Sequence, residues 1–100
     1  MKKYYVYILE CSDKSFYTGV TSNLELRINQ HNDGINHEAY TYKRRPVKLV
    51  YSIEFSDPII AIEKEKQLKK WSRKKKQALI NNEFELLPGL SKKHFRKKEN

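Results

Sequence analysis

Two short segments near the N-terminus, both rich in aromatic and β-branched residues, limit the possible folds more than any other feature. In residues 4–9 the side chains alternate, which would place Tyr5 and Tyr7 on the same face of a strand. Residues 12–14, Ser-Asp-Lys, have the composition of a turn, and residues 16–20 have that of a second strand. The two segments therefore predict an antiparallel β-hairpin at the start of the fold.

Helices and a third strand are expected after the hairpin. Ser22 and Glu25 have the spacing of a capping box, and Gly34 is placed to end the helix that they begin. Alternating apolar residues from Val47 to Phe55 predict a strand with one apolar face, and an Asp-Pro pair after it predicts a helix start. The expected elements are a helix, a loop, a strand and two further helices, over residues 22–34, 35–46, 47–55, 57–71 and 72–82.

The charge balance indicates a polyanionic partner. The 100 residues include 21 Lys and Arg against 12 Asp and Glu, which gives a net charge of +9. Such a surplus favours nucleic acid over a membrane surface, while the competing explanation is basicity for solubility alone. The length predicts one domain, which we place over residues 1–84, followed by a basic tail over residues 85–100 that is expected to be disordered.

The N-terminus and the cysteine content give expectations about location. The N-terminal apolar run is too short for a signal peptide or a membrane span, and Glu10 and Asp13 interrupt it. Cys11 is the single cysteine, so no intramolecular disulfide can form and nothing indicates an oxidising compartment. We therefore expect a cytoplasmic protein with no membrane partner.

Two predicted helices carry polar residues on faces that should be apolar. Arg27 and His31 lie on or beside the apolar stripe of the first helix, and Glu65 lies between Ala61 and Leu68 on the second. An unpaired carboxylate on such a stripe costs free energy. An ion pair between Arg27 and Glu65 would satisfy both, with His31 as an ordinary helix-end residue. A cleft with a metal ion at Glu65 and a phosphate at Arg27 is the alternative, and the spacing does not separate the two.

Two tyrosines and a glycine have a similar pair of explanations. Tyr7 and Tyr17 would share a face if their strands pair, and Gly19 lies on the face of Tyr17. Each tyrosine alone is explained by packing, with its hydroxyl at the rim of the core. Gly19 would leave that face open to the close approach of a ligand. The combination with the polar helix residues favours a functional site.

In their order along the chain, these residues resemble the motifs of the GIY-YIG nuclease superfamily. The matching residues are two tyrosine motifs, an Arg and a His one helical turn apart and a later helical Glu: Tyr5-Val6-Tyr7, Tyr17-Thr18-Gly19, Arg27, His31 and Glu65. The resemblance covers residues 4–80, and the Arg-Arg-Pro-Val stretch from Arg44 is similar to the small stand-alone bacterial branch. Tyr5 replaces the glycine of the first motif and Thr18 the isoleucine of the second. The working tyrosine is therefore Tyr5 or Tyr7, and the motif register favours Tyr7.

The resemblance implies both a fold and a reaction. The fold is α/β (α+β), a single domain in which a three-stranded antiparallel sheet is flanked by helices. The reaction is endonucleolytic hydrolysis of phosphodiester bonds, with one divalent ion, Mg²⁺ or Mn²⁺, held by Glu65. Tyr7 would orient or deprotonate the attacking water with Tyr17 as its partner. The implied catalytic residues are Tyr7, Tyr17, Arg27, His31 and Glu65.

The same resemblance assigns the remaining roles. Arg27 would neutralise charge that develops on the phosphate, because the transition state of phosphodiester hydrolysis gathers negative charge. His31 would orient a tyrosine or assist proton transfer, and Gly19 would leave space for the scissile strand. An unperturbed tyrosine has a pKa near 10, so a base role for Tyr7 needs help from its neighbours.

A surface for nucleic acid is predicted from the basic loop, the basic helices and Gly19. Loop tyrosines such as Tyr40 could stack on unpaired bases. DNA is favoured over RNA as the partner, and a protein partner could supply targeting. Two alternatives remain open: a non-catalytic nucleic-acid-binding module on the same scaffold, and a basic protein-interaction domain. The predicted nucleic-acid-binding residues are Gly19, Tyr42, Lys43, Arg44, Arg45, Lys69, Lys70 and Arg73.

Overall fold

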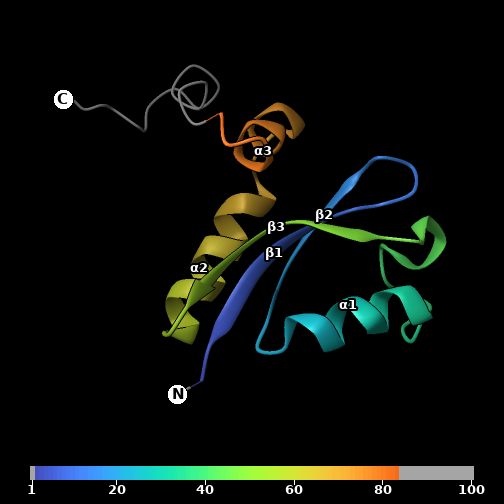
Figure 1. Ribbon diagram of the computed structural model, residues 1–100, viewed down its shortest axis with the longest axis horizontal. Helices are drawn as coiled ribbons and strands as arrows, with labels where there is room; N and C mark the ends of the chain where they lie inside the picture. Colours follow the sequence, from blue (N-terminus) through green and yellow to red (C-terminus); the bar gives the residue numbers. More distant parts are fainter. Residues whose placement is uncertain (1, 84–100) are drawn as a thin grey trace. The chain divides into compact units, whose positions relative to one another are not determined.

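The predicted hairpin forms two of the three strands of an antiparallel sheet (Figure 1). The computed structural model describes residues 2–83. Residues 70–83 belong to a second compact unit, so this segment and residues 2–69 are described separately. The elements of the first unit are β1 (Tyr4–Glu10), β2 (Phe16–Thr21), α1 (Leu24–Asp33), the 3₁₀-helix η1 (Tyr42–Arg44), β3 (Lys48–Phe55) and α2 (Pro58–Lys69).

Strand β1 lies in the middle of the sheet, in the order β2-β1-β3. Both neighbours pair antiparallel with it, and Tyr7 lies opposite Gly19 of β2 and Ser52 of β3. Because successive side chains point to opposite faces, the full burial of Val6 beside Tyr7 shows that both faces are covered. The predicted fold, a three-stranded antiparallel sheet flanked by helices, is confirmed.

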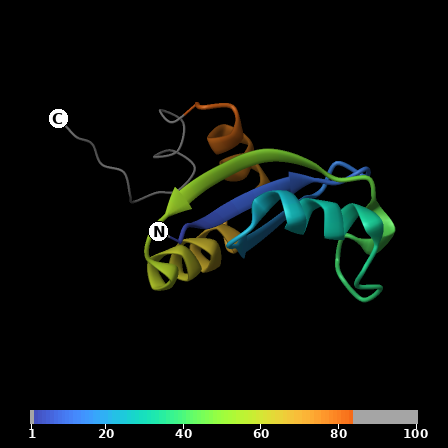
Figure 2. The ribbon, with the colours of Figure 1, turned by 60° about the horizontal axis from the view of Figure 1, so that its bottom comes forward.

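Helices α1 and α2 lie on opposite sides of the sheet (Figure 1), and Figure 2 shows α1 in front of the strands. Leu24 and Ile28 of α1 pack against a buried cluster that includes Tyr7 and Leu9. Helix α2 buries Ala61, Glu65 and Leu68, the stripe that its sequence predicts. The apolar stripes of both helices therefore face the sheet, and the polar residues on them are carried toward it.

A β-bulge in β3 corrects the prediction that its apolar residues share one face. Tyr51 pairs with Ile8, but Leu49 pairs with Leu9, so two steps along β3 match one step along β1. Cross-strand partners point to the same face, which places Leu49 and Tyr51 on opposite faces. The extra residue, Val50, breaks the alternation that the sequence shows. Val47 consequently joins the core on the α1 face.

Each end of α1 is set by a capping residue, and one of the two was predicted correctly from the sequence. The N-cap is Asn23, whose side-chain oxygen accepts a hydrogen bond of 3.1 Å from the backbone N–H of Leu26. The predicted capping box of Ser22 and Glu25 is therefore wrong, because Asn23 supplies the acceptor one residue later. Gly34 ends the helix as predicted, with a φ of 68° in the left-handed region.

The second unit contains the predicted final helix, α3 (Arg73–Ile80). Its N-cap is Ser72, whose hydroxyl oxygen accepts a hydrogen bond of 3.2 Å from the backbone N–H of Lys75. The expected domain end at residue 84 and the expected basic tail over residues 85–100 lie outside the described residues. None of the helices in the described part of the chain has the length and apolar content needed to cross a membrane.

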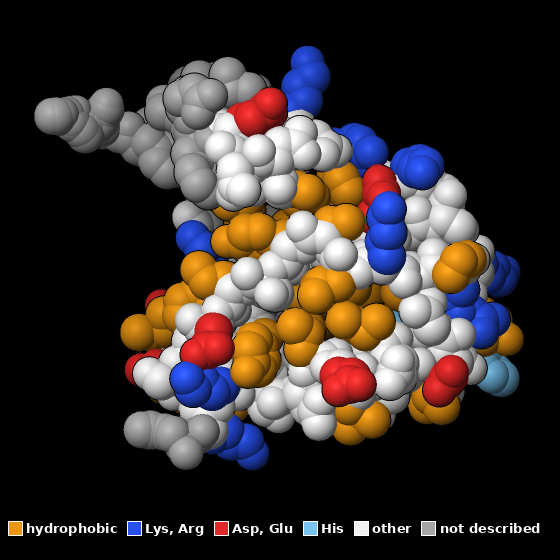
Figure 3. Space-filling view, in the orientation of Figure 1, with side chains coloured by type: hydrophobic (Ala, Val, Ile, Leu, Met, Phe, Trp, Pro, Cys, Tyr) orange, Lys and Arg blue, Asp and Glu red, His pale blue; other side chains and the backbone are white. Residues whose placement is uncertain are grey.

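The first unit also leaves apolar side chains exposed. Ile59, Ile60 and Ile62 at the start of α2 are each between 44% and 66% exposed. Figure 3 shows hydrophobic side chains exposed among charged ones on the face of the molecule seen in Figure 1. Scattered exposure of this kind is common on soluble domains and does not by itself define a site.

Candidate active site

Tyr7 is placed by its position in the central strand and by the glycine opposite it. Its side chain is fully buried and lies over Gly19 of β2. A Cβ atom on Gly19 would lie 2.5 Å from Cζ of Tyr7, closer than real Cβ contacts allow. The space beside Gly19 is therefore filled by the Tyr7 ring. The structure thus gives a packing reason for a glycine at this position. The resemblance had implied a different reason, namely space for the scissile strand.

A histidine links the Tyr7 hydroxyl to the loop that follows α1. Nε2 of His31 lies 3.2 Å from the hydroxyl oxygen of Tyr7, and Nδ1 lies 2.8 Å from Oγ1 of Thr41. Thr41 is only 1% exposed. If the tyrosine hydroxyl donates to Nε2, the single proton of the neutral imidazole is on Nδ1 and is donated to Thr41. The threonine thereby holds the ring in the tautomer that can accept from Tyr7.

The aromatic rings of Tyr7, Tyr17 and His31 form one contact group. The ring centroids are 6.3 Å apart for the two tyrosines and 5.2 Å apart for Tyr17 and His31. Tyr40, which is 43% exposed, stacks on the ring of Tyr17, with the two ring centroids 6.2 Å apart. A row of rings thus extends from the buried hydroxyl of Tyr7 to the surface.

Arg27 supplies positive charge to this group. Its Nε donates a hydrogen bond of 3.3 Å to Oε1 of Gln30, and its guanidinium also interacts with the hydroxyl of Tyr7. Burial and the charge of Arg27 lower the pKa of His31, so the imidazole is neutral at neutral pH. The guanidinium lines the cavity described below, where its positive charge can attract an anion.

Burial raises the pKa of Tyr7 to about 12. Tyr17 and Glu65 act in the same direction, while a hydrogen bond and the positive charge of Arg27 oppose the shift. The hydroxyl of Tyr7 is consequently protonated at neutral pH and can donate to His31. Tyr7 can act as a base only if it passes this proton on.

Glu65 joins the site from α2, and its ion-pair partner is a residue other than Arg27, the partner in one of the two alternatives that the sequence left open. The carboxylate is 9% exposed, and its Oε2 lies 2.8 Å from Nζ of Lys69, one helical turn later. The ion pair with Arg27 is therefore absent from the described structure. The hydrogen bond to Glu65 raises the pKa of Lys69. The i,i+4 spacing of Glu65 and Lys69 was a readable signal for this pair.

A single carboxylate of this kind fits a divalent ion that keeps most of its water. Mg²⁺ takes one or two protein carboxylates and retains several waters. Oε1 of Glu65 makes no hydrogen bond to any described residue, and Lys69 contacts only Oε2. No group of three or more His, Cys, Asp or Glu side chains within the described residues could hold a metal. Glu65 is thus the residue that would hold an ion here.

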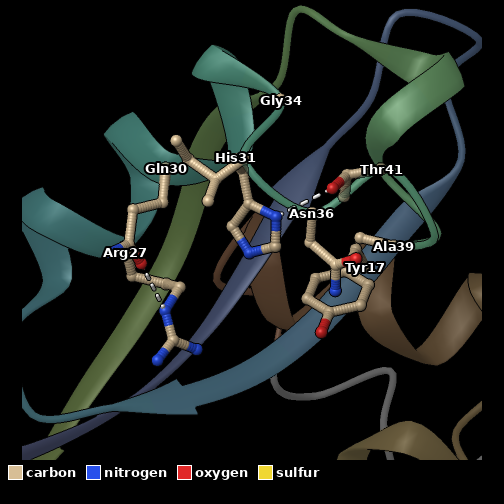
Figure 4. Close-up of a pocket in the computed structure, with 9 residues that line it drawn as sticks. Tyr17, Arg27, Gln30, His31, Gly34, Asn36, Ala39 and Thr41 are labelled. Atoms are coloured by element: carbon tan, nitrogen blue, oxygen red, sulfur yellow. Dashed lines mark hydrogen bonds between the residues drawn. The ribbon is translucent and has the colours of Figure 1, made fainter.

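A cavity of about 280 Å³ opens beside the site (Figure 4). Tyr17, Arg27 and His31 point toward it from the strand and helix that bear them. The other lining residues come from the end of α1 and the loop after it. Together they are Tyr17, Arg27, Gln30, His31, Gly34, Ile35, Asn36, Ala39 and Thr41.

The predicted nucleic-acid-binding residues lie in several environments. Arg44 donates a hydrogen bond to Asp13 at 3.1 Å and one to the carbonyl oxygen of Tyr40 at 2.7 Å. Arg45 donates to the carbonyl oxygen of Tyr42 at 2.7 Å and lies over the ring of that residue. Both guanidinium groups therefore hold the loop in place. Their predicted contact with nucleic acid stays a prediction.

The other predicted binding residues are exposed, or they lie in α2 and in the second unit. Lys43 is exposed and makes no hydrogen bond or ion pair with any residue in the range 2–83. Lys69 is occupied by Glu65. Lys70 and Arg73 are exposed residues of the second unit. The structure thus brings together the five predicted catalytic residues and not the eight predicted binding residues.

Sequence reasoning missed residues of α1 and of the loop after it that hold the site. Thr41 positions His31, and Gln30 accepts from Arg27. Asn32 accepts from the backbone N–H of Val47 at 2.7 Å and donates to its carbonyl oxygen at 3.0 Å. These uncharged side chains give no signal in one sequence. Only the i,i+3 spacing of Arg27 and Gln30 on one helix face was readable.

The fold and this geometry agree with the comparison to known families. Residues 3–78 match the model of the GIY-YIG catalytic domain. The chain therefore belongs to the GIY-YIG family, as its motifs predicted.

More closely, the chain is similar to bacterial UPF0213 proteins. It is 52% identical to the UPF0213 protein of Syntrophus aciditrophicus (strain SB) over 81 residues, which are 80% of this chain and 92% of the relative. The solution NMR structure of a UPF0213 protein from Bacillus halodurans is 40% identical, with a TM-score of 0.52, and covers 79% of this chain and 83% of that one. A solution NMR structure from E. faecalis is 32% identical, with a TM-score of 0.58, and covers 99% and 97%.

Proposed function

We propose that this protein is an endonuclease that hydrolyses phosphodiester bonds in DNA with a divalent metal ion. The observation that supports this most is the hydrogen bond between the buried Tyr7 hydroxyl and Nε2 of His31, with Arg27 and Glu65 acting on the same hydroxyl. Membership of the GIY-YIG family supports the class of reaction. The net charge of +9 supports a polyanionic substrate.

In this proposal Tyr7 and His31 form a proton relay. The hydroxyl oxygen of Tyr7 takes a proton from the attacking water while its own proton moves to Nε2 of His31. The imidazole can accept that proton because burial and Arg27 keep it neutral. Thr41 keeps Nδ1 occupied and so directs Nε2 toward the tyrosine. The relay removes the obstacle that a tyrosine with a pKa of about 12 poses to a base role.

Arg27 and Glu65 would act on the phosphate side of the reaction. The guanidinium of Arg27, which lines the cavity, would bind the non-bridging oxygens, where negative charge grows in the transition state. Glu65 would hold the divalent ion, Mg²⁺ or Mn²⁺, which supplies further positive charge to the phosphate and the leaving oxygen when bound. Lys69 contacts the other oxygen of this carboxylate and keeps it oriented.

The test compares two glutamates on the same helix. Glu65→Gln should lower the rate of plasmid nicking and of branched-DNA cleavage with Mn²⁺ by about 100-fold or more. Glu63→Gln is the control, because Glu63 is exposed and only two residues away. Equal cleavage by wild type and a folded Glu65→Gln variant would contradict the proposal, as would the absence of cleavage on every DNA tested.

The ion pair at Glu65 favours a second candidate, a non-catalytic DNA-binding module. Lys69 already neutralises the carboxylate, so the fold does not need a metal ion to bury it. This candidate predicts DNA binding that is independent of divalent ions and unchanged in Glu65→Gln. Binding measured with EDTA and with Mn²⁺, alongside cleavage, separates the two candidates.

A further inference from the structure

The cavity beside the candidate active site contains two amide groups with free donors. Oε1 of Gln30 accepts from Nε of Arg27, and Oδ1 of Asn36 accepts from the backbone N–H of Glu38 at 3.0 Å. Each partner is a donor, so each amide must direct its oxygen to that partner. The NH₂ groups of both amides are left over, and neither has a hydrogen-bond partner among the described residues. Both residues line the cavity (Figure 4).

The size and walls of the cavity suit one planar ring system. Its volume of about 280 Å³ lies just below the range of roughly 300–1,000 Å³ that is usual for sites of drug-sized ligands. Tyr17 provides an aromatic wall, and Ile35, which is 67% exposed, provides an aliphatic one at the rim. Enzymes that act on unpaired nucleotides hold the base between such walls and bind its edge with hydrogen bonds.

The cavity is continuous with the proposed phosphate site. Arg27 and His31 line it, and Arg27 brings its positive charge to it. A phosphate bound at Arg27 would therefore bring the base of an adjoining nucleotide to Gln30 and Asn36. We infer that this cavity is a subsite for one unpaired nucleotide next to the scissile phosphate, and that the two amides donate hydrogen bonds to the edge of its base. The inference rests on the proposed nuclease function and names its substrate class.

The fit to a base edge follows from the chemistry of the bases. Guanine, cytosine and thymine present carbonyl oxygens as acceptors, and adenine presents ring nitrogens such as N7. The two amide donors in the cavity can therefore bind the exposed edge of an unpaired base. DNA that exposes an unpaired nucleotide, as a flap, bulge or gap does, is therefore the preferred substrate.

The first experiment is independent of cleavage. The ¹⁵N-labelled full chain is titrated with dCMP, dGMP, dTMP and dAMP in the absence of metal, and the side-chain amide signals are followed. The signals of Gln30 and Asn36 should shift with each of the four nucleotides, because every base presents a hydrogen-bond acceptor. Inorganic phosphate should leave these two amide signals in place. An equal shift of both amides with inorganic phosphate alone, or no shift of either amide with any nucleotide, would overturn the inference.

Near-isosteric variants test the donors without removing the contacts that hold them. Gln30→Glu and Asn36→Asp keep the acceptor oxygens for Arg27 and Glu38 but lose the free NH₂ groups. Asn29→Asp introduces the same charge change on an exposed residue of α1 that does not line the cavity. The two cavity variants should weaken nucleotide binding about tenfold relative to Asn29→Asp. Equal binding by all three variants would contradict the subsite.

Cleavage then separates this inference from the function on which it rests. Wild type should cut a flap or bulge faster than the same sequence fully paired, and Asn36→Asp should reduce that preference. Cleavage of paired and unpaired DNA at equal rates would overturn the subsite while leaving the nuclease intact. Absence of all cleavage would count against the nuclease, and the nucleotide titration would still decide the cavity.

Discussion

The group around Tyr7 and the loop around η1 both contain polar and charged side chains, but they use them differently. In the first group, His31 and Arg27 of α1 line one cavity, and the buried hydroxyl of Tyr7 in β1 contacts His31. In the loop, Arg44 and Arg45 direct their guanidinium groups to backbone carbonyl oxygens and aromatic rings of the same loop. Charge alone therefore does not identify a binding residue.

The difference lies in what each side chain stabilises. A loop without regular secondary structure has backbone carbonyl groups that need donors, and arginine supplies several in one plane. The strands and helices around Tyr7 satisfy their own backbone groups, so their side chains remain free for chemistry. We expect substitutions in the loop to change stability first, and substitutions in the Tyr7 group to change activity first.

The largest effect is expected from removing one oxygen atom in the Tyr7 group. Tyr7→Phe removes the hydroxyl that contacts His31 and should lower the cleavage rate by about 10²- to 10⁴-fold. Steady-state cleavage of the preferred DNA measures it. Tyr5→Phe, on the same face but with no described hydroxyl partner, is the control and should change the rate little. A larger loss in Tyr5→Phe would assign the working role to Tyr5.

Gly19→Ala should destabilise the fold by about 1–3 kcal/mol. The added Cβ would collide with the ring of Tyr7, and both residues are in the middle of the sheet. Urea denaturation measures the change in the free energy of unfolding. In a Tyr7→Leu background the same substitution should cost less, because the ring has gone. An equal cost in both backgrounds would mean that the Tyr7 ring is not what the glycine accommodates.

The lowered pKa of His31 predicts a pH dependence of stability. The unfolded chain binds a proton near pH 6.5 more readily than the folded one, since burial and Arg27 oppose the charged form. This contribution is fully present above pH 6.5 and is lost as the pH falls, with a slope of at most about 1.4 kcal/mol per pH unit. His31→Gln should remove this slope from the free energy of unfolding between about pH 7.5 and 5.

A matched histidine serves as the control for this pH dependence. His37 is exposed in the loop after α1, where its ring contacts Tyr42. His37→Gln should leave the slope in place. If His31→Gln and wild type lose stability in parallel as the pH falls, the effect does not arise from the Tyr7–His31 pair.

The smallest effect is expected in DNA affinity, and it tests whether exposed and hydrogen-bonded basic residues of the same loop differ in role. Lys43→Gln should reduce the salt dependence of DNA binding by about one phosphate contact, a slope change of about 0.9. Arg44→Gln should mainly lower the melting temperature, because it removes the contacts to Asp13 and Tyr40. Fluorescence anisotropy across salt concentrations and thermal denaturation give the two readouts. A larger slope change for Arg44→Gln would reverse the assignment.

Much of the fold was readable because it depends on local patterns. Alternation predicted the hairpin, and helical periodicity predicted which faces of α1 and α2 meet the sheet. Gly34 and Ser72 were readable as helix ends because caps have specific side-chain and backbone requirements. The errors arose where two local signals compete. Asn23 and Ser22 are both good caps, and the bulge at Val50 leaves no mark in an alternating sequence.

By itself, the sequence determined the order of the elements and the identity of the five residues of the candidate site. Helical and strand periodicity shows which face of an element a residue occupies, and the order and spacing of the motif residues can be read directly from the sequence. The tertiary structure alone decided the partners: Lys69 for Glu65, the Tyr7 ring for Gly19, and Thr41 for His31. It also oriented the two amides toward their cavity. The reason is physical, because a hydrogen bond depends on distances of a few tenths of an ångström between elements, which no single-sequence pattern encodes.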